Sequence, residues 1–291
     1  MKKVSASYLQ EQENVNAYFQ SRSLQWRKIY EGSGVEAEII RDRHAAVLAW
    51  IDSLKLAPGS SVLEVGCGAG FMAVALAQRG FHVQAFDSSE AMIKQARRNA
   101  EESLTNDLLT LKVRDVYSLD FSDDSFDLVL AIGVIPWLER LEPAIQEMVR
   151  VIKPGGYIIL TTANRMGLMS ILDPWRNPAF EPFKRRFKEL LNSIAHRNFS
   201  PSMSFHTNRF IDKTLARQKC IKNRSMARGF GFSLHNRSIL PEPFGTQIHH
   251  LLQRLADRNV PVFRSIGMAY FVLARKKLSQ SFVRSMNVHE S

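Results

Sequence analysis

The stretch SVLEVGCGAGF, residues 61–71, decides the fold of this chain of 291 residues. Val62, Leu63 and Val65 are typical of a buried strand. Three glycines follow at alternate positions, Gly66, Gly68 and Gly70, and let the backbone turn sharply and approach a ligand closely. Residues 72–80 then have helical spacing and stop at a glycine. A strand, a glycine-rich turn and a helix in this order predict an open α/β sheet with a ligand at the carboxyl end of the strand.

The glycine spacing indicates the kind of ligand. A dinucleotide fingerprint, G-x-G-x-x-G, would need a glycine where this chain has Phe71. The pattern here is E-x-G-x-G-x-G, with Glu64 two residues ahead of the first glycine. A carboxylate at this point repels a pyrophosphate and suits a cationic or amine-bearing ligand, or one held through an ordered water.

This segment resembles the first motif of class I S-adenosylmethionine-dependent methyltransferases. The resemblance implies an α/β fold with a doubly wound, seven-stranded, mostly parallel sheet of the Rossmann-like methyltransferase type, and S-adenosylmethionine as the cofactor. In that family the glycine turn lies against the methionine part of the cofactor. The resemblance therefore assigns five residues of the turn to cofactor binding: Glu64, Gly66, Cys67, Gly68 and Gly70.

A second motif, FHVQAFDSSEAMIKQARRNA, spans residues 81–100. Asp87 ends its strand 23 residues after Glu64, near the ribose-binding spacing of nucleotide-binding βαβ units, and its carboxylate is suited to accept both ribose hydroxyls. Ser88 or Ser89 would cap the next helix. Met92 falls where the family packs an apolar side chain on the adenine ring, although helix core is an equal alternative.

Two further strand ends complete the cofactor site that the resemblance implies. After residues 109–113, Asp115 would accept a bond from the adenine amino group and the Val116 amide would meet a ring nitrogen; a surface aspartate in a turn is the alternative. The strand within residues 125–138 adds Ile132 and Gly133. Many relatives end it with histidines, where this chain has Pro136 and Trp137, so Trp137 is predicted as an apolar wall beside the methyl group.

Composition and charge narrow the function classes. The hydrophobic content of 45% is enough for a full core, and two cysteines argue against a disulfide scaffold or a zinc cluster, so no metal is expected. We find neither a signal-peptide core nor an apolar run of membrane-spanning length, and expect a cytoplasmic protein. Residues 1–164 hold 17 Lys and Arg against 21 Asp and Glu, a net of −4, whereas residues 165–291 hold 22 against 7, a net of +15. This asymmetry indicates an anionic partner, or else a basic solvated face with none.

Four segments are expected along the chain. Residues 1–50 are predicted as a helical lid, 51–164 as the cofactor-binding core, 165–275 as a substrate-covering insertion followed by the strands that complete the sheet, and 276–291 as a disordered tail. A helix is expected at 208–218, strand and loop at 229–244, a helix at 248–259 and a last strand at 267–277. The basic amphipathic stretch 182–194 is either a lid, a core-packing helix or a patch for peripheral membrane contact.

The N-terminal arm has its own resemblance. Its aromatic residues, Tyr18, Phe19, Trp26 and Tyr30, lie in a segment similar to the arm of magnesium-protoporphyrin methyltransferases, where such helices cover the cofactor site. We therefore place Trp26, Tyr30 and Trp137 at the substrate. Packing of the arm on the core is the alternative for the aromatic residues.

Together these features predict an S-adenosylmethionine-dependent methyltransferase that methylates a hydroxyl or carboxylate of a small molecule in a biosynthetic pathway. If the basic C-terminal part attracts the acceptor, that molecule is anionic. A hydroxyl acceptor needs a base, for which His206, His44, Tyr18 and Tyr30 are weak candidates, whereas a carboxylate needs none. An RNA methyltransferase is an alternative, but the chain lacks an N/D-P-P-Y/F tetrapeptide, paired catalytic cysteines and an appended RNA-binding module. A non-catalytic cofactor-binding subunit is the other.

Overall fold

The computed structural model describes residues 12–21, 32, 34–105, 107–173, 177, 180, 204, 206–231, 233–234, 237–238 and 240–278. Its strands are β1 (Ser61–Val65), β2 (His82–Asp87), β3 (Leu109–Val113), β4 (Phe126–Ile132), β5 (Ile152–Ala163), β6 (Cys220–Arg228), β7 (Ser233–Leu234), β8 (Arg237–Ser238) and β9 (Ala269–Lys276). Its helices are α2 (Val35–Leu54), α3 (Phe71–Ala77), α4 (Glu90–Glu102), the short 3-10 turn η1 (Ile135–Trp137), α5 (Leu141–Arg150), α6 (Leu168–Leu172), α8 (Asn208–Arg217) and α9 (Glu242–Asp257). Residues 12–21 form a further helix ahead of α2.

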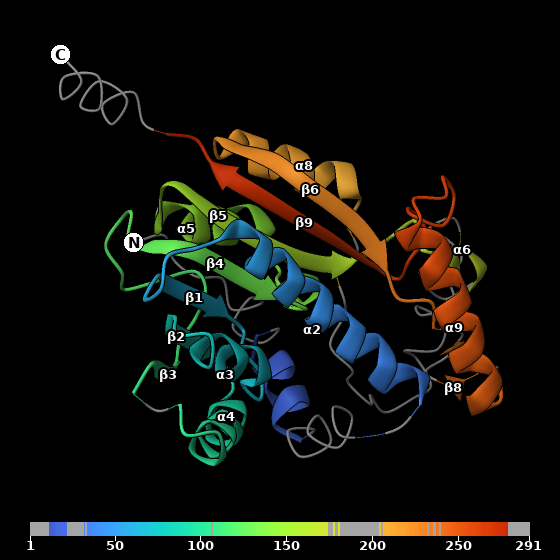
Figure 1. Ribbon diagram of the computed structural model, residues 1–291, viewed down its shortest axis with the longest axis horizontal. Coiled ribbons are helices and arrows are strands. Elements are labelled where there is room, and N and C mark those ends of the chain that lie inside the picture. Colours follow the sequence, from blue (N-terminus) through green and yellow to red (C-terminus); the bar gives the residue numbers. More distant parts are fainter. Residues whose placement is uncertain are drawn as a thin grey trace, which may run out of the picture.

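One seven-stranded sheet organises the molecule, in the order β3-β2-β1-β4-β5-β9-β6 (Figure 1). The five strands β3, β2, β1, β4 and β5 are parallel, and β9 is antiparallel to both β5 and β6. The chain reverses strand order after β3, so β1 and β4 are neighbours at the centre of the sheet. The predicted α/β fold, with its doubly wound mostly parallel sheet and antiparallel final pair, is confirmed.

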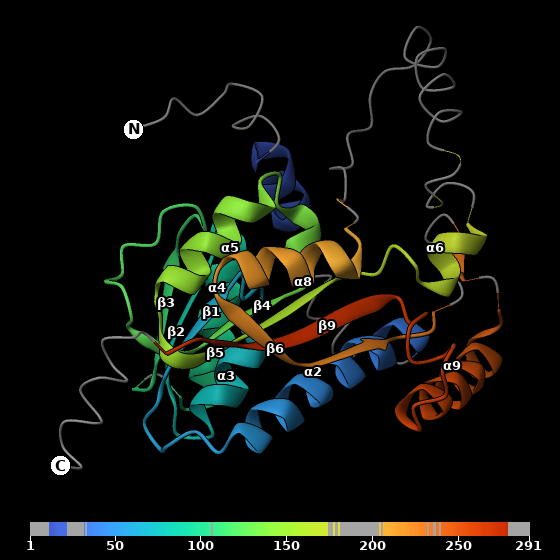
Figure 2. The same ribbon diagram turned by 90° about the horizontal axis from the view of Figure 1, so that it is seen from above.

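Helices cover both faces of this sheet, as Figure 2 shows from above. The alternation of strand side chains sorts the core in two, because successive residues point to opposite faces. Val62 and Leu128 pack with α2, α3 and α4, whereas Leu63 and Val129 pack with α5 and α8. All four are fully buried, which explains the continuous apolar runs in the sequence of the central strands.

The penultimate strand of the sheet lies earlier in the chain than we expected. The sequence indicated strand and loop over residues 229–244, but the strand is β6 at 220–228, and 229–244 hold a loop, the small β7–β8 hairpin and the start of α9. The prediction was wrong because β6 is an edge strand whose side chains at 221–225 are all exposed. Its sequence, CIKNRSMAR, is therefore polar and basic and shows no buried-strand pattern.

Several segment boundaries can be compared with the sequence. The expected end of the lid at residue 50 falls inside α2, whose Val47 and Ile51 are buried in the core, and β9 continues to Lys276, where the tail was expected to begin. Most of the expected insertion, including the basic stretch 182–194, lies outside the described residues, as do residues 279–291. Within the described residues, no helix combines the length and apolar character needed to cross a membrane.

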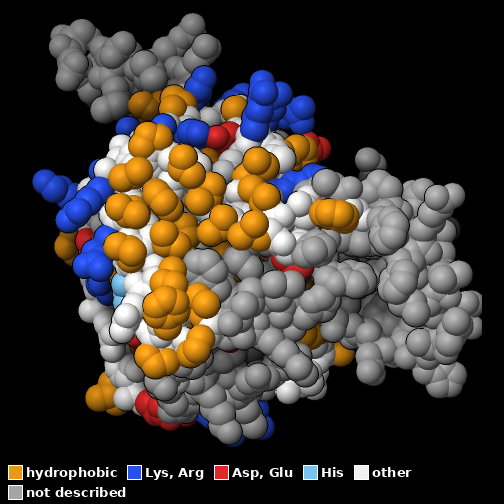
Figure 3. All heavy atoms as spheres, turned by 90° about the vertical axis from the view of Figure 1, so that its right-hand side faces the viewer, with side chains coloured by type: hydrophobic (Ala, Val, Ile, Leu, Met, Phe, Trp, Pro, Cys, Tyr) orange, Lys and Arg blue, Asp and Glu red, His pale blue; other side chains and the backbone are white. Residues whose placement is uncertain are grey.

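The parallel strands point to the right in Figure 1, so their carboxyl ends meet on that side, together with α6 and α9. Figure 3 faces this side and shows hydrophobic side chains gathered over one area, with Lys and Arg at its edges.

A lysine of the last strand ties the sheet to the end of α5. Lys276 Nζ lies 2.8 Å from Asp124 Oδ1 and within 2.6–3.3 Å of the carbonyl oxygens of Val149, Arg150 and Ile152. We expect Lys276→Met to lower the free energy of unfolding by about 2 kcal/mol, because charge-assisted bonds to several acceptors are lost. Urea denaturation measures this. The neighbouring Lys277→Met, whose side chain is exposed, is the control, and equal losses in both variants would contradict the assignment.

Candidate functional site

The glycine turn between β1 and α3 is held from three directions. The Cys67 amide donates to the carbonyl of Phe86 in β2 at 3.0 Å, and the Gly68 amide donates to Asp87 Oδ2 at 2.9 Å. From α4, buried Asn99 donates its amide to the Ala69 carbonyl at 2.8 Å. These bonds fix the turn at the carboxyl ends of β1 and β2.

The glycines of the turn serve different purposes. A Cβ on Gly66 would lie 2.3 Å from Val134 Cγ2, and one on Gly70 would lie 2.7 Å from Ala96 Cβ, so both positions need glycine for packing. Gly68 has φ +54° and no atom within 4 Å of such a Cβ. The space in front of Gly68 is therefore open, as expected where a ligand approaches the backbone.

A pocket opens at this point and gathers most of the predicted site residues. From the sequence-based set its lining includes Glu64, Gly66, Cys67, Gly68, Asp87, Ser88, Met92, Asp115, Val116, Ile132, Gly133, Trp137 and His44. Gly70 is absent from the lining and caps α3 while packing on α4. Trp26 and Tyr30 lie outside the described residues.

Two carboxyl groups sit at the base of the pocket. Burial raises the pKa of Glu64 to about 8, and the neighbouring Asp87 adds to the shift. Burial also raises the pKa of Asp87, whereas amide donors from Ser89 and Gly68 oppose the rise. Glu64 Oε2 is buried without a hydrogen-bond partner. The pocket therefore presents an unsatisfied acceptor that a cationic group would stabilise in its ionised form.

Arg43 of α2 enters the same pocket, and the sequence analysis missed it. A Cβ on Gly133 would lie 3.1 Å from Arg43 Nη1, and Arg43 Nε is buried without a hydrogen-bond partner. Arg43 precedes His44, which the sequence analysis did name, but nothing in the sequence indicated that the Arg43 side chain enters the pocket. Asn99 was missed for a similar reason, since a polar residue within a helix pattern is usually solvated.

Aromatic side chains close one side of the pocket. Phe19, on the helix at 12–21, and Trp137, in η1, both line it, with ring centroids 5.0 Å apart. Tyr18 packs on Trp137 at 5.5 Å and on Phe19 at 5.3 Å. The same helix is tied to the loop after β2, because Ser88 Oγ donates to Asn16 Oδ1 at 2.7 Å. The N-terminal helix thus covers the pocket.

The base candidates differ in position and basicity. His44 lines the pocket, but burial and the Arg43 cation lower its pKa to about 3, so it is a weak proton acceptor. His206 is not among the lining residues. It forms a β-bridge with Asn164 beyond β5 and stacks on Phe210 at 5.4 Å, and burial lowers its pKa. The phenol of Tyr18 belongs to the aromatic cluster over the pocket.

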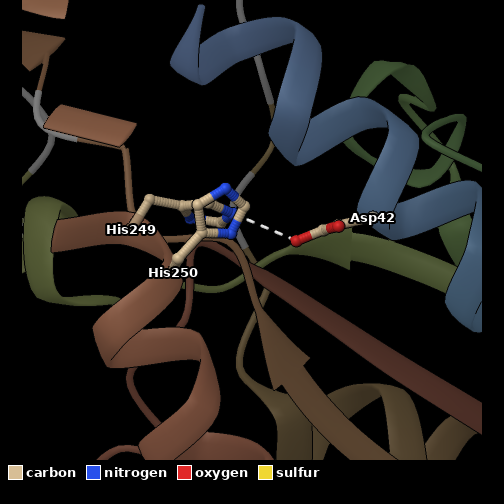
Figure 4. Close-up of side chains that lie close together, drawn as sticks. All are labelled: Asp42, His249 and His250. Carbon is tan, nitrogen blue, oxygen red and sulfur yellow. Dashed lines mark hydrogen bonds and ion pairs between the residues drawn. The ribbon is translucent and has the colours of Figure 1, made fainter. Parts of the chain in front are cut away.

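A second cluster of Asp42, His249 and His250 has the composition of a metal site, and Figure 4 shows the three side chains converging. Its hydrogen bonds argue against a metal. The Phe230 amide donates to His249 Nδ1 at 3.1 Å, so in the neutral ring Nε2 carries the proton and donates to Asp42 Oδ2 at 3.1 Å. With both nitrogens of the buried ring occupied, His249 links α2 to α9.

Comparison with known proteins finds similarity over the part of the chain that builds most of the pocket. The family model of the methyltransferase domain matches residues 63–160. The chain is 34% identical over 118 residues to the ubiquinone biosynthesis O-methyltransferase of Paracidovorax citrulli, covering 40% of this chain and 50% of that protein. It is 30% identical over 149 residues to the 2-methyl-6-phytyl-1,4-hydroquinone methyltransferase of Synechocystis, covering 46% of each. The chain spans about half the length of these curated relatives.

The fold extends further than the sequence similarity. The crystal structure of magnesium protoporphyrin IX methyltransferase from Synechocystis with bound S-adenosylhomocysteine superimposes with a TM-score of 0.61 at 20% identity, covering 92% of this chain and all of that one. At this identity the likeness concerns the fold alone.

The glycine geometry separates packing from ligand contact. Both Gly66 and Gly68 have positive φ, so either alanine costs about 1–2 kcal/mol of backbone strain. Gly66→Ala adds the clash with Val134 and should lose a further 1–3 kcal/mol of stability. Gly68→Ala should remain the more stable variant but bind S-adenosylmethionine more weakly. Thermal unfolding and calorimetry measure the two effects, and the reverse order of stabilities would contradict this division.

Proposed function

We propose that the protein transfers a methyl group from S-adenosylmethionine to an oxygen of a small-molecule acceptor, because residues 63–160 match the methyltransferase domain model and the chain has the fold of a solved methyltransferase. One observation carries the cofactor assignment. Among the described residues, six buried side-chain nitrogen or oxygen atoms lack a hydrogen-bond partner, and two of them, Glu64 Oε2 and Arg43 Nε, belong to residues lining one pocket. One carboxyl group and one guanidinium are complementary to the ammonium and carboxylate of an amino acid.

The remaining lining residues fit the rest of the cofactor. Asp87, held by two backbone amides, has oxygen lone pairs left for the ribose hydroxyls, with Ser88 beside it. Met92 and Val116 supply apolar contact for the adenine, and Asp115 an acceptor for its amino group. The bound cofactor supplies an electrophilic methyl group on a sulfonium.

The protein's own contribution is then to position the acceptor and exclude water. Phe19 and Trp137 form an apolar wall whose two rings are nearly perpendicular, so an aromatic acceptor can meet one ring face and one ring edge, and the helix at 12–21 covers the opening. The names of the two relatives, an O-methyltransferase of ubiquinone biosynthesis and a hydroquinone methyltransferase, support an aromatic acceptor of the hydroquinone type. With a pKa of about 3, His44 is too weak a base to take the proton of a phenol. We therefore expect the proton to pass to solvent or to a residue that moves over the pocket when the acceptor binds.

The amino-acid end of the cofactor can be tested separately from its nucleoside end. Glu64→Gln and Arg43→Met should each weaken S-adenosylmethionine binding about tenfold or more, because a charge-assisted bond is lost. Methylthioadenosine keeps the nucleoside and lacks the amino acid, so its affinity should stay unchanged in both variants. Calorimetry gives all four comparisons. Equal losses for both ligands would show that the substitutions disturb the pocket as a whole.

The raised pKa of Glu64 adds a proton signature. Near neutral pH, below the free-state pKa of about 8, the carboxyl is mainly protonated, and pairing with an ammonium requires it to ionise. Binding of S-adenosylmethionine should therefore release a proton, and affinity should fall as the pH drops further below 8. Calorimetry in buffers of different ionisation enthalpy counts that proton. Glu64→Gln should abolish the release, and an unchanged release in this variant would move the titrating group elsewhere.

The acceptor class is tested with methyl-labelled S-adenosylmethionine and a panel of hydroquinones, aromatic carboxylic acids and RNA. We expect label on the phenolic oxygen of a hydroquinone. Label on a carboxylate would support methyltransferase activity but show that the acceptor is a carboxylic acid and not a phenol. Labelled RNA would replace the small-molecule assignment, and tight cofactor binding with no labelled product across the panel would favour a non-catalytic subunit.

A further inference from the structure

An apolar surface lies on the side of the molecule where the strands end. Twelve large hydrophobic side chains are exposed among the described residues, and half of them belong to α6, α9 and the segments flanking them. We call this set the end patch: Met166, Ile171, Leu172, Phe244, Leu251 and Val262, which are 43–62% exposed. α6 and α9 both lie on the right-hand side in the two ribbon views, although Figure 2 shows them apart from each other, and Figure 3 shows hydrophobic side chains gathered on this side.

The segments that carry the end patch are joined to one another. The Leu168 amide donates to the Ile266 carbonyl at 2.8 Å. Asn164, which is fully buried, donates to the carbonyls of Ser265 and Gly267 at 2.8 Å. The start of α6 and the loop after α9 are therefore fixed to each other, and the exposed apolar side chains are presented by a common support.

Basic side chains continue the outer face of α9. Phe244 and Leu251 are seven residues apart, and Arg254 and Arg258 follow Leu251 by three and seven, so all four fall on one helical face. All four are exposed, whereas His249 and Gln253 on the opposite face are buried. Arg264 is exposed in the loop that follows. An apolar stripe that ends in guanidinium groups suits the boundary between acyl chains and anionic headgroups.

The end patch also lies near the pocket. α6 begins five residues after the end of β5, whose Thr161 Oγ accepts the Gly133 amide of the pocket at 2.7 Å. α9 is joined to α2 through His249 and Asp42 at 3.1 Å, and the next residue of α2, Arg43, lines the pocket.

We propose that the end patch docks on an anionic lipid bilayer and so brings the pocket to an acceptor dissolved in the membrane. The proposal rests on the proposed function, since hydroquinones with isoprenoid tails partition into bilayers. Charge supports a bilayer over a second copy of the chain, because residues 165–291 carry a net +15, with 22 Lys and Arg against 7 Asp and Glu. Two such surfaces repel each other, whereas anionic headgroups attract one.

Flotation with vesicles tests the docking without cofactor or acceptor. The wild-type protein should float with vesicles of phosphatidylcholine and phosphatidylglycerol, and much less with phosphatidylcholine alone. Leu251→Glu with Val262→Glu should weaken binding about tenfold or more, because two inserted apolar side chains become acidic. Leu104→Glu with Ile221→Glu makes the same chemical change at exposed side chains outside the end patch and should bind like wild type. Arg254→Gln with Arg258→Gln should remove most of the preference for anionic vesicles.

Each contrary outcome overturns the proposal. Absence of the wild-type protein from both kinds of floated vesicle would show that the protein does not bind bilayers. Flotation of the end-patch pair at the wild-type level would show that the end patch is not the binding surface. A concentration-dependent dimer in sedimentation that the end-patch pair makes monomeric would assign the surface to a second copy. A lowered melting temperature in that pair with unchanged flotation would assign it to another segment of the chain.

Activity separates this proposal from the proposed function. The end-patch pair should keep wild-type kcat/KM on a short-chain, water-soluble hydroquinone and lose it on a long-chain hydroquinone embedded in vesicles. If the protein floats with vesicles while neither acceptor is methylated, the membrane-docking proposal holds and the proposed methyl transfer to a hydroquinone is wrong. If both acceptors are methylated equally by the pair and by wild type, the function stands and the docking fails.

Discussion

The carboxylate of Asp87 is the constraint on which the pocket depends. Its Oδ2 accepts the Gly68 amide and its Oδ1 accepts the Ser89 amide, each at 2.9 Å. One side chain at the end of β2 therefore fixes both the turn after β1 and the start of α4. Replacing Asp87 would release the turn along with any ligand contact, so a loss of affinity there cannot by itself assign a ribose contact. Glu64 and Arg43, which lack such structural bonds at the atoms in question, separate the two effects better.

Buried polar atoms without partners oppose folding, because they lose water and gain nothing in return. At this pocket the cost falls on groups of opposite charge, Glu64 and Arg43, which line the same space without a hydrogen bond between the atoms concerned. Burial already shifts Glu64 toward its neutral form. A zwitterionic ligand relieves both groups at once, so the free energy withheld from folding becomes available for binding, which is how perturbed groups come to mark functional sites.

The sequence was sufficient to locate β1, β2 and β4, because these strands are largely apolar and end at a glycine or an aspartate. The type of sheet and most of the pocket lining followed from the resemblance to methyltransferases that these strand ends carry. The edge strand β6 did not, since its exposed side chains remove the apolar signal. Arg43 and Asn99 were also missed, because their roles come from tertiary packing against Gly133 and Ala69, far away in the chain. His206 showed the opposite error, because a histidine that suggests a catalytic base in the sequence can still lie outside the pocket lining.

Helix α2 connects these parts of the molecule, and its geometry explains how. Successive residues of a helix point about 100° apart. Asp42 can therefore pair with His249 of α9 while Arg43 and His44 turn toward the pocket. About one and two turns after Arg43, Val47 and Ile51 are fully buried against the sheet, which prevents α2 from rotating to satisfy one contact at the expense of another. The position of α9, and with it the outer surface at the carboxyl end of the sheet, is thus set by the same helix that places a cation in the pocket. A displacement of α9 would be carried to Arg43 through the hydrogen bond between His249 and Asp42 and a rigid helix.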